Sequence, residues 1–254
     1  MAAYQGSEVR TRRAAITLAV IVVFMMIRFD IAAYLYTRAA TFYHREVVSS
    51  RIINDYVKGH GVRKLQIGAG PSNLPGWLNT DIEPTVGQAY LDATAVFPLP
   101  DGSIDYVFAE QLIEHLTYEQ GLVMLKECLR VLRSGGRIRI ATPNLNRLID
   151  LFGPSQTAQM KAYIPSELQF HSWPATADNE GYILNQHMRR WGHKFVYSAK
   201  MLQAHLQAAG FHDVTVERPG ESTDPNLAGI DLRAHGEVRS LNEYDTMVLE
   251  ALRP

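Results

Sequence analysis

The chain has 254 residues, of which 46% are hydrophobic and 20% are charged, so it suits one α/β domain with additions or two small domains. Its formal net charge of -1 argues against a nucleic-acid-binding surface. A single cysteine, Cys128, excludes an internal disulfide framework and a cysteine-rich metal or cluster site. Cys128 lies among apolar residues with helical spacing, so we expect it in the core of a protein from a reducing compartment.

Residues 1–60 are predicted to form a helical extension. Residues 14–27 are almost wholly apolar, yet a helix over them reaches only about 21 Å against a hydrocarbon core of about 30 Å. Extending this helix to residue 36 gives enough length but includes Arg28 and Asp30, each of which costs about 2.5–3.5 kcal/mol near the bilayer centre. We expect residues 14–36 to tether a cytoplasmic protein to the inner face of the cell membrane.

Two other interpretations of this apolar segment stay open. A secretory signal peptide also has a basic start and an apolar middle, although no clear small-x-small cleavage site follows here. A soluble helix packed on the following domain is the simplest alternative. Basic residues lie on both sides of the segment, so the distribution of positive charge does not fix an orientation.

The main domain is expected over residues 61–254, after a second helix at 42–57 and a helix stop at Gly59-His60-Gly61. Short apolar runs bounded by turn residues predict five strands in its first half. These strands are expected at residues 64–68, 77–81, 88–92, 104–109 and 137–142. Leucines at helical spacing predict a helix over residues 117–132 that ends at the glycines after Ser134.

The second half of the domain begins with an expected insertion or lid at residues 143–195, which has no clear period and contains Trp173 and Trp191. A helix at 198–209 and two late strands complete the chain. The late strands are expected at residues 214–218 and 246–251. This alternation predicts an α/β, Rossmann-like doubly wound fold with a mostly parallel seven-stranded sheet.

A Gly-x-Gly turn, Gly68-Ala69-Gly70, follows the first strand directly. Glycine has no Cβ and reaches positive φ, so such a turn brings bare backbone close to a ligand. In open α/β sheets, ligands bind outside the carboxyl ends of the strands. Asp81 would end the second strand, where a carboxylate can accept hydrogen bonds from both ribose hydroxyls.

Three further polar residues would reach the same edge of the sheet. Asp92 would end the third strand, where it can accept from an adenine amine, and Glu110 and Gln111 would end the fourth. The ordered set predicts a nucleoside-cofactor site. The alternative is that these residues are solvated turn residues, because turns favour aspartate and glycine.

Residues 65–145 resemble a class I S-adenosylmethionine-dependent methyltransferase, and most of the chain after residue 62 is similar to a bacterial subgroup linked to cell-surface polysaccharide genes. The first matching segments are Leu65-Gln66-Ile67-Gly68-Ala69-Gly70, Trp77-Leu78-Asn79-Thr80-Asp81-Ile82 and Leu99-Pro100-Asp101-Gly102-Ser103-Ile104-Asp105-Tyr106-Val107. The others are Glu114-His115-Leu116, Leu132-Arg133-Ser134-Gly135-Gly136-Arg137-Ile138-Arg139-Ile140, Leu184-Asn185, Trp191-Gly192-His193-Lys194-Phe195-Val196-Tyr197 and Gly210-Phe211.

The resemblance implies S-adenosyl-L-methionine as the cofactor and a set of residues that bind it. These residues are Gly68, Ala69, Gly70, Asp81, Ile82, Asp92, Ala93, Glu110 and Gln111. The chain departs from the superfamily in three ways, all near the methionine end of the cofactor. Gln66 stands where an acidic residue often holds the methionine amino group, a third glycine is missing, and the link between the first two strands is short.

The implied reaction is in-line transfer of a methyl group from a sulfonium to a nucleophile, for which the protein must place the nucleophile about 3–3.5 Å from the methyl carbon. An oxygen acceptor of high pKa also needs a general base, and His115 and His193 are the candidates. The expected acceptor is a sugar or glycan hydroxyl or a small molecule. No metal-ligand spacing stands out, so no metal is expected.

Other functions remain open or are disfavoured by the residues. A nicotinamide dehydrogenase would need a third glycine and an acidic residue later than Asp81. A methylase acting on nucleic-acid bases would need a different motif where Glu110-Gln111-Leu112-Ile113 stands. The alternative from another class is a non-catalytic, membrane-associated binding or scaffold protein that retains the methyltransferase fold.

Overall fold

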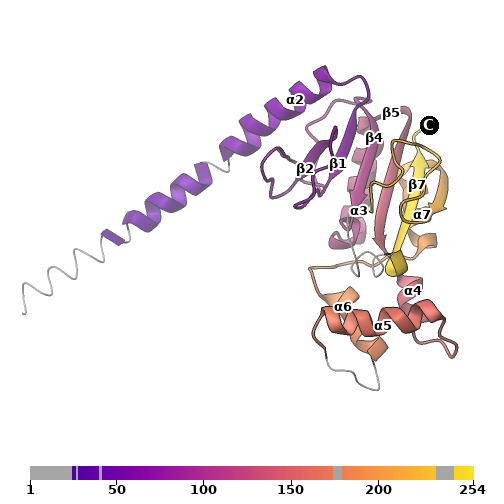
Figure 1. The fold of residues 1–254 in the computed structure, drawn as a ribbon. Coiled ribbons are helices and arrows are strands. Elements are labelled where there is room, and N and C mark those ends of the chain that lie inside the picture. Colours follow the sequence, from indigo (N-terminus) through magenta and orange to yellow (C-terminus); the bar gives the residue numbers. More distant parts are fainter. Residues whose placement is uncertain (1–24, 27, 40–41, 174–178, 233–242) are drawn as a thin grey trace, which may run out of the picture. The chain divides into compact units, whose positions relative to one another are not determined.

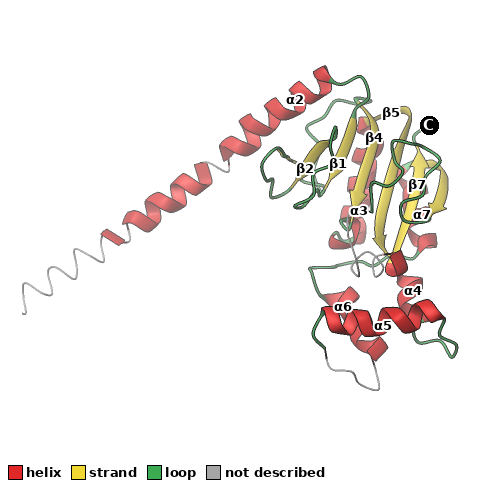
Figure 2. Cartoon of the chain, viewed as in Figure 1, coloured by secondary structure: helices red, strands yellow, loops and turns green. Residues whose placement is uncertain are grey.

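The computed structural model describes residues 25–26, 28–39, 42–173, 179–232 and 243–254. The chain divides into two compact units, residues 1–48 and residues 49–254. Residues 14–24 and 27, which belong to the expected membrane segment, lie outside the described residues. Figures 1 and 2 show the helices and strands of the described part.

The described part of the first unit is helical. Residues 28–39 form a helix, and a π-helical turn, His44–Val48, closes the unit. Among the described residues of this unit, ten large hydrophobic side chains are exposed. They are Met25, Met26, Phe29, Ile31, Tyr34, Leu35, Tyr36, Phe42, Tyr43 and Val47. Among the described residues, no helix combines the length and apolar composition needed to cross a bilayer.

A seven-stranded sheet forms the centre of the second unit, with the strand order β3-β2-β1-β4-β5-β7-β6. The strands are β1 (Lys64–Ile67), β2 (Leu78–Asp81), β3 (Ala89–Tyr90), β4 (Ile104–Glu110), β5 (Leu132–Pro143), β6 (His212–Glu217) and β7 (Thr246–Leu252). The first five strands pair in parallel, and β7 pairs antiparallel with both β5 and β6. The predicted Rossmann-like, mostly parallel sheet is thus confirmed.

The topology reverses between β1 and β4, because β2 and β3 lie on one side of β1 and the later strands lie on the other. The carboxyl ends of β1, β2 and β4 therefore meet at one edge of the sheet, at a topological switch point. Residue pairs such as Ile67 with Thr80 and Ile67 with Ala109 fix this alignment.

One face of the sheet packs against three helices, α2 (Ser49–Gly59), α3 (Tyr118–Val131) and α7 (Ala199–Ala209). Thr117 caps the start of α3 with a capping box, and Ser198 caps the start of α7. Gly210 ends α7 with φ of 109°, as its sequence predicts. Cys128 is buried in the core between α3 and the sheet, as expected.

The other face is covered differently. Phe108, on β4, packs with Leu74, Trp77 and Leu227 from loops rather than from helices. Arg139 of β5 pairs with Phe108 of β4 and so lies on the same face of the sheet. Its side chain is fully buried. Its guanidinium pairs with Glu250 of β7 and with Asp231, and so fastens the loop after β6 to the sheet.

The expected insertion contains three helices, α4 (Leu145–Asp150), α5 (Ala158–Phe170) and α6 (Asn179–Arg189). They gather beyond the carboxyl end of β5 (Figure 2). These helices share a small core of their own, to which Leu148, Ile164, Leu168 and Ile183 contribute.

Several boundaries differ from the sequence expectations, among them the following. Helix α3 ends at Val131 and its C-cap, Leu132, is already extended and paired with Ile104, so Gly135 does not terminate that helix. Strand β3 has only two residues, which leaves Asp92 two positions beyond its end. Helix α2 lies in the same compact unit as the sheet, whereas the sequence analysis placed its residues in the extension. Tyr56 ties α2 to the sheet by accepting from the Lys64 amide at 2.8 Å.

Candidate functional site

The Gly-x-Gly turn lies at the carboxyl end of β1 and uses the conformational freedom of both glycines. Gly68 has φ of 67° and Gly70 has φ of 53°. A Cβ on Gly68 would lie 3.0 Å from the nearest Leu112 methyl carbon, so a larger residue would be both strained and crowded. Around Gly70 a Cβ would meet nothing within 4 Å, so the backbone there faces open space.

Asp81 holds this bend from the end of β2. Its Oδ2 accepts a hydrogen bond from the Gly70 amide at 2.9 Å, and its Oδ1 accepts from the Glu83 amide at 2.9 Å. The Ala69 amide donates to the Thr80 carbonyl at 2.9 Å. The carboxylate is half-buried, so each oxygen keeps acceptor capacity for a ligand beside the exposed backbone of the bend.

Gln66 and Gln88 stabilise the same bend through side-chain hydrogen bonds to its backbone. Gln66 is buried, donates to the Ser72 carbonyl at 3.2 Å and accepts from the Leu74 amide at 3.3 Å. Gln88 donates to the Gly70 carbonyl at 2.7 Å. No helix follows β1, because residues 68–77 form turns that these side chains stabilise. The departure at Gln66 thus has a structural role, which the sequence did not reveal.

Asp92 and its neighbours follow the third strand. The Leu91 amide donates to the Asp81 carbonyl at 3.0 Å, which places Asp92 beside the end of β2. Asp92 Oδ1 accepts from the amide and the hydroxyl of Thr94, at 2.8 and 2.7 Å. Ala93 is buried, whereas Ile82 is 59% exposed and presents an apolar surface next to Asp81.

Glu110 and Gln111 lie where β4 ends. Glu110 is the last residue of the strand, and Gln111 leaves it with φ of 50°, an uncommon value for a residue other than glycine. Gln111 is exposed, and its side chain donates to the hydroxyl of Thr246 at 3.2 Å. The predicted cofactor residues therefore converge on the carboxyl ends of β1, β2, β3 and β4.

The two candidate bases, His115 and His193, lie together although 77 residues separate them in sequence. Their ring centroids are 4.9 Å apart with the rings perpendicular. Burial lowers the pKa of each imidazole below its ordinary value, which favours the neutral ring. A ring nitrogen of His193, Nδ1, contacts the His187 carbonyl at 2.6 Å.

Glu114 is a further candidate functional residue. From the sequence it belongs to the segment Glu114-His115-Leu116, but no role is predicted for it there. It is fully buried, and its Oε2 accepts from the hydroxyl of Thr142 on β5 at 2.9 Å. Burial raises the pKa of its carboxyl to about 7, with the charge of His187 opposing that rise. The only signal in the sequence was an acidic residue directly before a histidine at the end of a strand.

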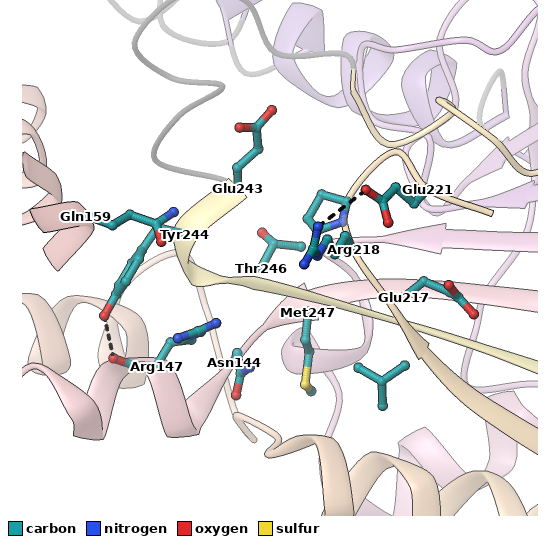
Figure 3. A pocket seen from close by; sticks show the side chains of 12 residues that line it. Asn144, Arg147, Gln159, Glu217, Arg218, Glu221, Glu243, Tyr244, Thr246 and Met247 are labelled. Carbon is teal, nitrogen blue, oxygen red and sulfur yellow. Dashed lines mark hydrogen bonds and ion pairs between the residues drawn. The ribbon is translucent and has the colours of Figure 1, made fainter. Parts of the chain in front are cut away.

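A polar pocket of about 630 Å³ lies farther along the sheet, between the end of β5, the end of β6 and the start of β7 (Figure 3). Arg147, Arg218 and three glutamates line it, so its charge is mixed. None of the predicted site residues lines this pocket. Thr246, which does line it, is the hydrogen-bond partner of Gln111, so the pocket adjoins the predicted cofactor edge.

The segment that contains the glycine bend and Asp81 is similar to known proteins. Residues 66–140 match the family model described as a methyltransferase domain. Two strains of Mycobacterium tuberculosis have a probable S-adenosylmethionine-dependent methyltransferase that is 34% identical over 89 residues. This match covers 35% of the chain and 30% of the relative. Residues 66–140 are therefore similar to a methyltransferase domain.

Other similar proteins include a probable S-adenosylmethionine-dependent methyltransferase from Mycolicibacterium smegmatis, 50% identical over 50 residues, which are 20% of this chain and 19% of the relative. A methyltransferase structure from Archaeoglobus fulgidus is 23% identical, with a TM-score of 0.43 over 82% of this chain and 94% of the other. A structure from Thermotoga maritima described as a possible histamine N-methyltransferase is 15% identical, with a TM-score of 0.45 over 87% and 99% of the two chains.

The geometry at the carboxyl edge fits S-adenosylmethionine, the cofactor named for these relatives. Two glycines at positive φ expose the backbone, and the Asp81 carboxylate is held against that backbone with capacity to accept ribose hydroxyls. Gln66 is uncharged, and both ends of its side-chain amide are bonded to the backbone of the bend. It therefore offers no carboxylate to the methionine amino group. The site thus fits the adenosine end of the cofactor better than the methionine end.

Proposed function

We propose that the whole chain transfers a methyl group from S-adenosylmethionine to an oxygen of a sugar, glycan or small molecule. The observation that carries the proposal is the direct hydrogen bond between the Gly70 amide and the Asp81 carboxylate. This bond unites the bend after β1 with the acidic end of β2, inside the segment that matches the methyltransferase family model. In this proposal Gly68, Ala69, Gly70 and Asp81 bind the adenosine end of the cofactor.

The remaining predicted residues take complementary roles. Ile82 and Ala93 contact the adenine ring, Asp92 accepts from its amine, and Glu110 and Gln111 border the cofactor at the end of β4. When bound, the cofactor supplies a methyl group on a good leaving group. One of the two imidazoles, of His115 or His193, then accepts the proton of the acceptor hydroxyl, because burial favours the neutral form that can act as a base.

A sugar hydroxyl is our preferred acceptor because the late motifs, such as residues 191–197, resemble those of methyltransferases linked to surface polysaccharides. A hydroxyl of this kind has a high pKa and needs a general base, which the paired histidines can provide. The opposing candidate is a scaffold protein without turnover. The role of Gln66 as a structural brace favours it, because this position then lacks the charge that often holds the methionine end.

A transfer experiment separates these candidates. The full chain is incubated with S-adenosylmethionine that carries a tritiated methyl group and, separately, with a surface-polysaccharide fraction, lipid-linked sugars and small sugars. We expect label in a carbohydrate fraction, and much less of it with the H193A or H115A variant. Tight cofactor binding without label in any fraction would support the scaffold instead.

We further propose that the first unit attaches the protein to a membrane surface. The described residues 28–39 expose apolar side chains such as Phe29, Leu35 and Tyr36, and Arg28 and Arg38 lie in the same helix. Apolar side chains together with arginines suit the boundary between headgroups and acyl chains, where both kinds of side chain are stabilised.

A further inference from the structure

Glu114, His115 and His193 form a cluster whose donor atoms converge. A carboxylate oxygen of Glu114 and one ring nitrogen of each histidine all lie within 4.8 Å of one another. Glu114 and His115 belong to the short 3-10 helix after β4 (Ile113–His115), and His193 lies in the turn after α6. The Lys194 and Phe195 amides donate to the Glu114 carbonyl at 2.7 and 3.1 Å, so the backbone holds the two segments together.

The Glu114 carboxylate is incompletely satisfied within the described residues. Thr142 donates to its Oε2, whereas its buried Oε1 has no hydrogen-bond partner among those residues. A buried carboxylate oxygen without a partner is costly, and it is commonly explained by a bound ion or water. The position of Glu114 beside two histidines favours an ion of positive charge.

Each of the two histidines makes a contact with the backbone. His193 Nδ1 contacts the His187 carbonyl at 2.6 Å, and His115 makes a hydrogen bond to the backbone of Trp191. In metal sites, the ring nitrogen that does not bind the metal typically donates to a carbonyl or carboxylate, which fixes the tautomer and the ring. The bend that presents His193 contains Trp191 at φ of 55° and Gly192 at φ of 80°.

We propose that Glu114, His115 and His193 bind one divalent transition-metal ion of the Zn²⁺ type. Two imidazoles and one carboxylate suit such ions, whereas Mg²⁺ and Ca²⁺ prefer ligand sets made of oxygen alone. Bonds of about 2.0–2.2 Å to zinc would draw the three donor atoms slightly closer together. No metal is expected from the sequence alone, because an adjacent Glu-His pair with a third ligand 78 residues beyond the histidine matches no common ligand spacing.

Three protein ligands leave at least one position of the ion open, as in catalytic rather than structural zinc sites. The cluster follows β4 directly, beyond Glu110 and Gln111 at the predicted cofactor edge. The open position would therefore take an oxygen of the methyl acceptor. With the ion bound, the ion rather than a free imidazole would lower the pKa of that hydroxyl, because both histidines are then occupied as ligands. This part of the inference rests on the proposed function. Metal binding itself does not rest on it.

The test is calorimetric titration of the tag-free full chain with Zn²⁺ after treatment with a chelator. We expect one equivalent of Zn²⁺ to bind, and an affinity at least 10-fold weaker in each of E114Q, H115A and H193A. The H212A variant removes a surface histidine of β6 and should bind like the wild type. Zn²⁺ should also raise the unfolding temperature of the wild type but not of H193A, because only the native state holds the ligands together.

Binding of much less than one equivalent, or unchanged affinity in an H115A/H193A double variant, would overturn the metal site. Circular dichroism before titration selects variants that fold, and E114Q serves if a histidine variant does not, since glutamine preserves the volume of the side chain. Titration with S-adenosylmethionine is run separately. If the protein binds Zn²⁺ but not S-adenosylmethionine, the proposed function is refuted and the metal site stands. If it binds S-adenosylmethionine but not Zn²⁺, the metal site is refuted and the proposed function stands.

Discussion

In the proposed function, Asp81 is the side chain on which cofactor binding depends most directly, because it holds the Gly70 amide and has oxygens that could accept from ribose hydroxyls. We predict that D81A weakens S-adenosylmethionine binding by about 1–3 kcal/mol, roughly 5- to 150-fold. Calorimetry measures the change. E83A is the matched control, because Glu83 is exposed and contributes only its backbone amide to the bend. Equal affinities of D81A and the wild type would remove Asp81 from the site.

Gln66 gives a second prediction at the scale of one residue. In Q66E the donor to the Ser72 carbonyl is lost and a carboxylate is buried, so we expect the free energy of unfolding to fall by about 1–3 kcal/mol. Urea denaturation measures this change, with Q207E on the exposed side of α7 as a control expected within about 0.5 kcal/mol of the wild type. If Q66E is as stable as Q207E, the structural role of Gln66 is wrong.

The sequence correctly places Asp81 beside the glycine bend, because the carboxyl ends of parallel strands must share one edge of the sheet. Their role in cofactor binding stays a prediction. The sequence does not predict Gln88 or Glu114. Gln88 reaches the Gly70 carbonyl across a loop, and Glu114 becomes buried only when the residues after α6 pack on it. Their roles depend on tertiary contacts that have no local pattern in the sequence.

At the scale of elements, strands and helices with a regular period were predicted closely, such as β1, β4 and α7. The helices of the insertion were not. In α5 the buried positions follow helical spacing, yet one of them is Glu167 and a proline, Pro165, lies inside the helix. A buried acid and an internal proline break the apolar pattern from which a helix is predicted.

Glu167 also makes the insertion sensitive to pH. Burial and the nearby charge of Asp245 raise the pKa of its carboxyl to about 7, while His187 opposes the rise. The folded state therefore holds this proton more tightly than the unfolded chain, whose carboxyl has a pKa near 4.5. The stabilisation from this group is fully present below about pH 4.5 and is lost as the pH rises through about 7.

We predict that the wild type loses about 2–3 kcal/mol more stability than E167Q between pH 5 and pH 8. Urea denaturation of both proteins at the two pH values gives this difference directly. Glutamine keeps the shape of the side chain without titrating, so other groups that titrate cancel in the comparison. An identical loss of stability in the two proteins would show that Glu167 keeps an ordinary pKa.

At the scale of the whole molecule, the first and second units have separate roles in the proposed function. Deleting residues 1–48 should move the protein from the membrane fraction to the soluble fraction, because the exposed apolar residues around Phe29 and Tyr36 are removed. Cell fractionation with immunoblotting measures the distribution. Full-length protein that is already in the soluble fraction would refute membrane attachment.

The fold of the second unit could be predicted from the sequence as a whole, because each strand, turn and helix cap favours the same parallel sheet. The acceptor could not be predicted in the same way. The surface that binds the acceptor is expected to depend on α5, α6 and the loops after β6. The sequences of those segments contain no motif that indicates a particular ligand.

Binding of S-adenosylmethionine to the full chain tests the central claim most directly. Calorimetric titration should show one cofactor molecule bound per chain, with clearly weaker binding in D81A than in E83A. Absence of binding heat, together with no rise in the unfolding temperature at saturating cofactor, would contradict the claim that the bend after β1 and the Asp81 carboxylate form a cofactor site.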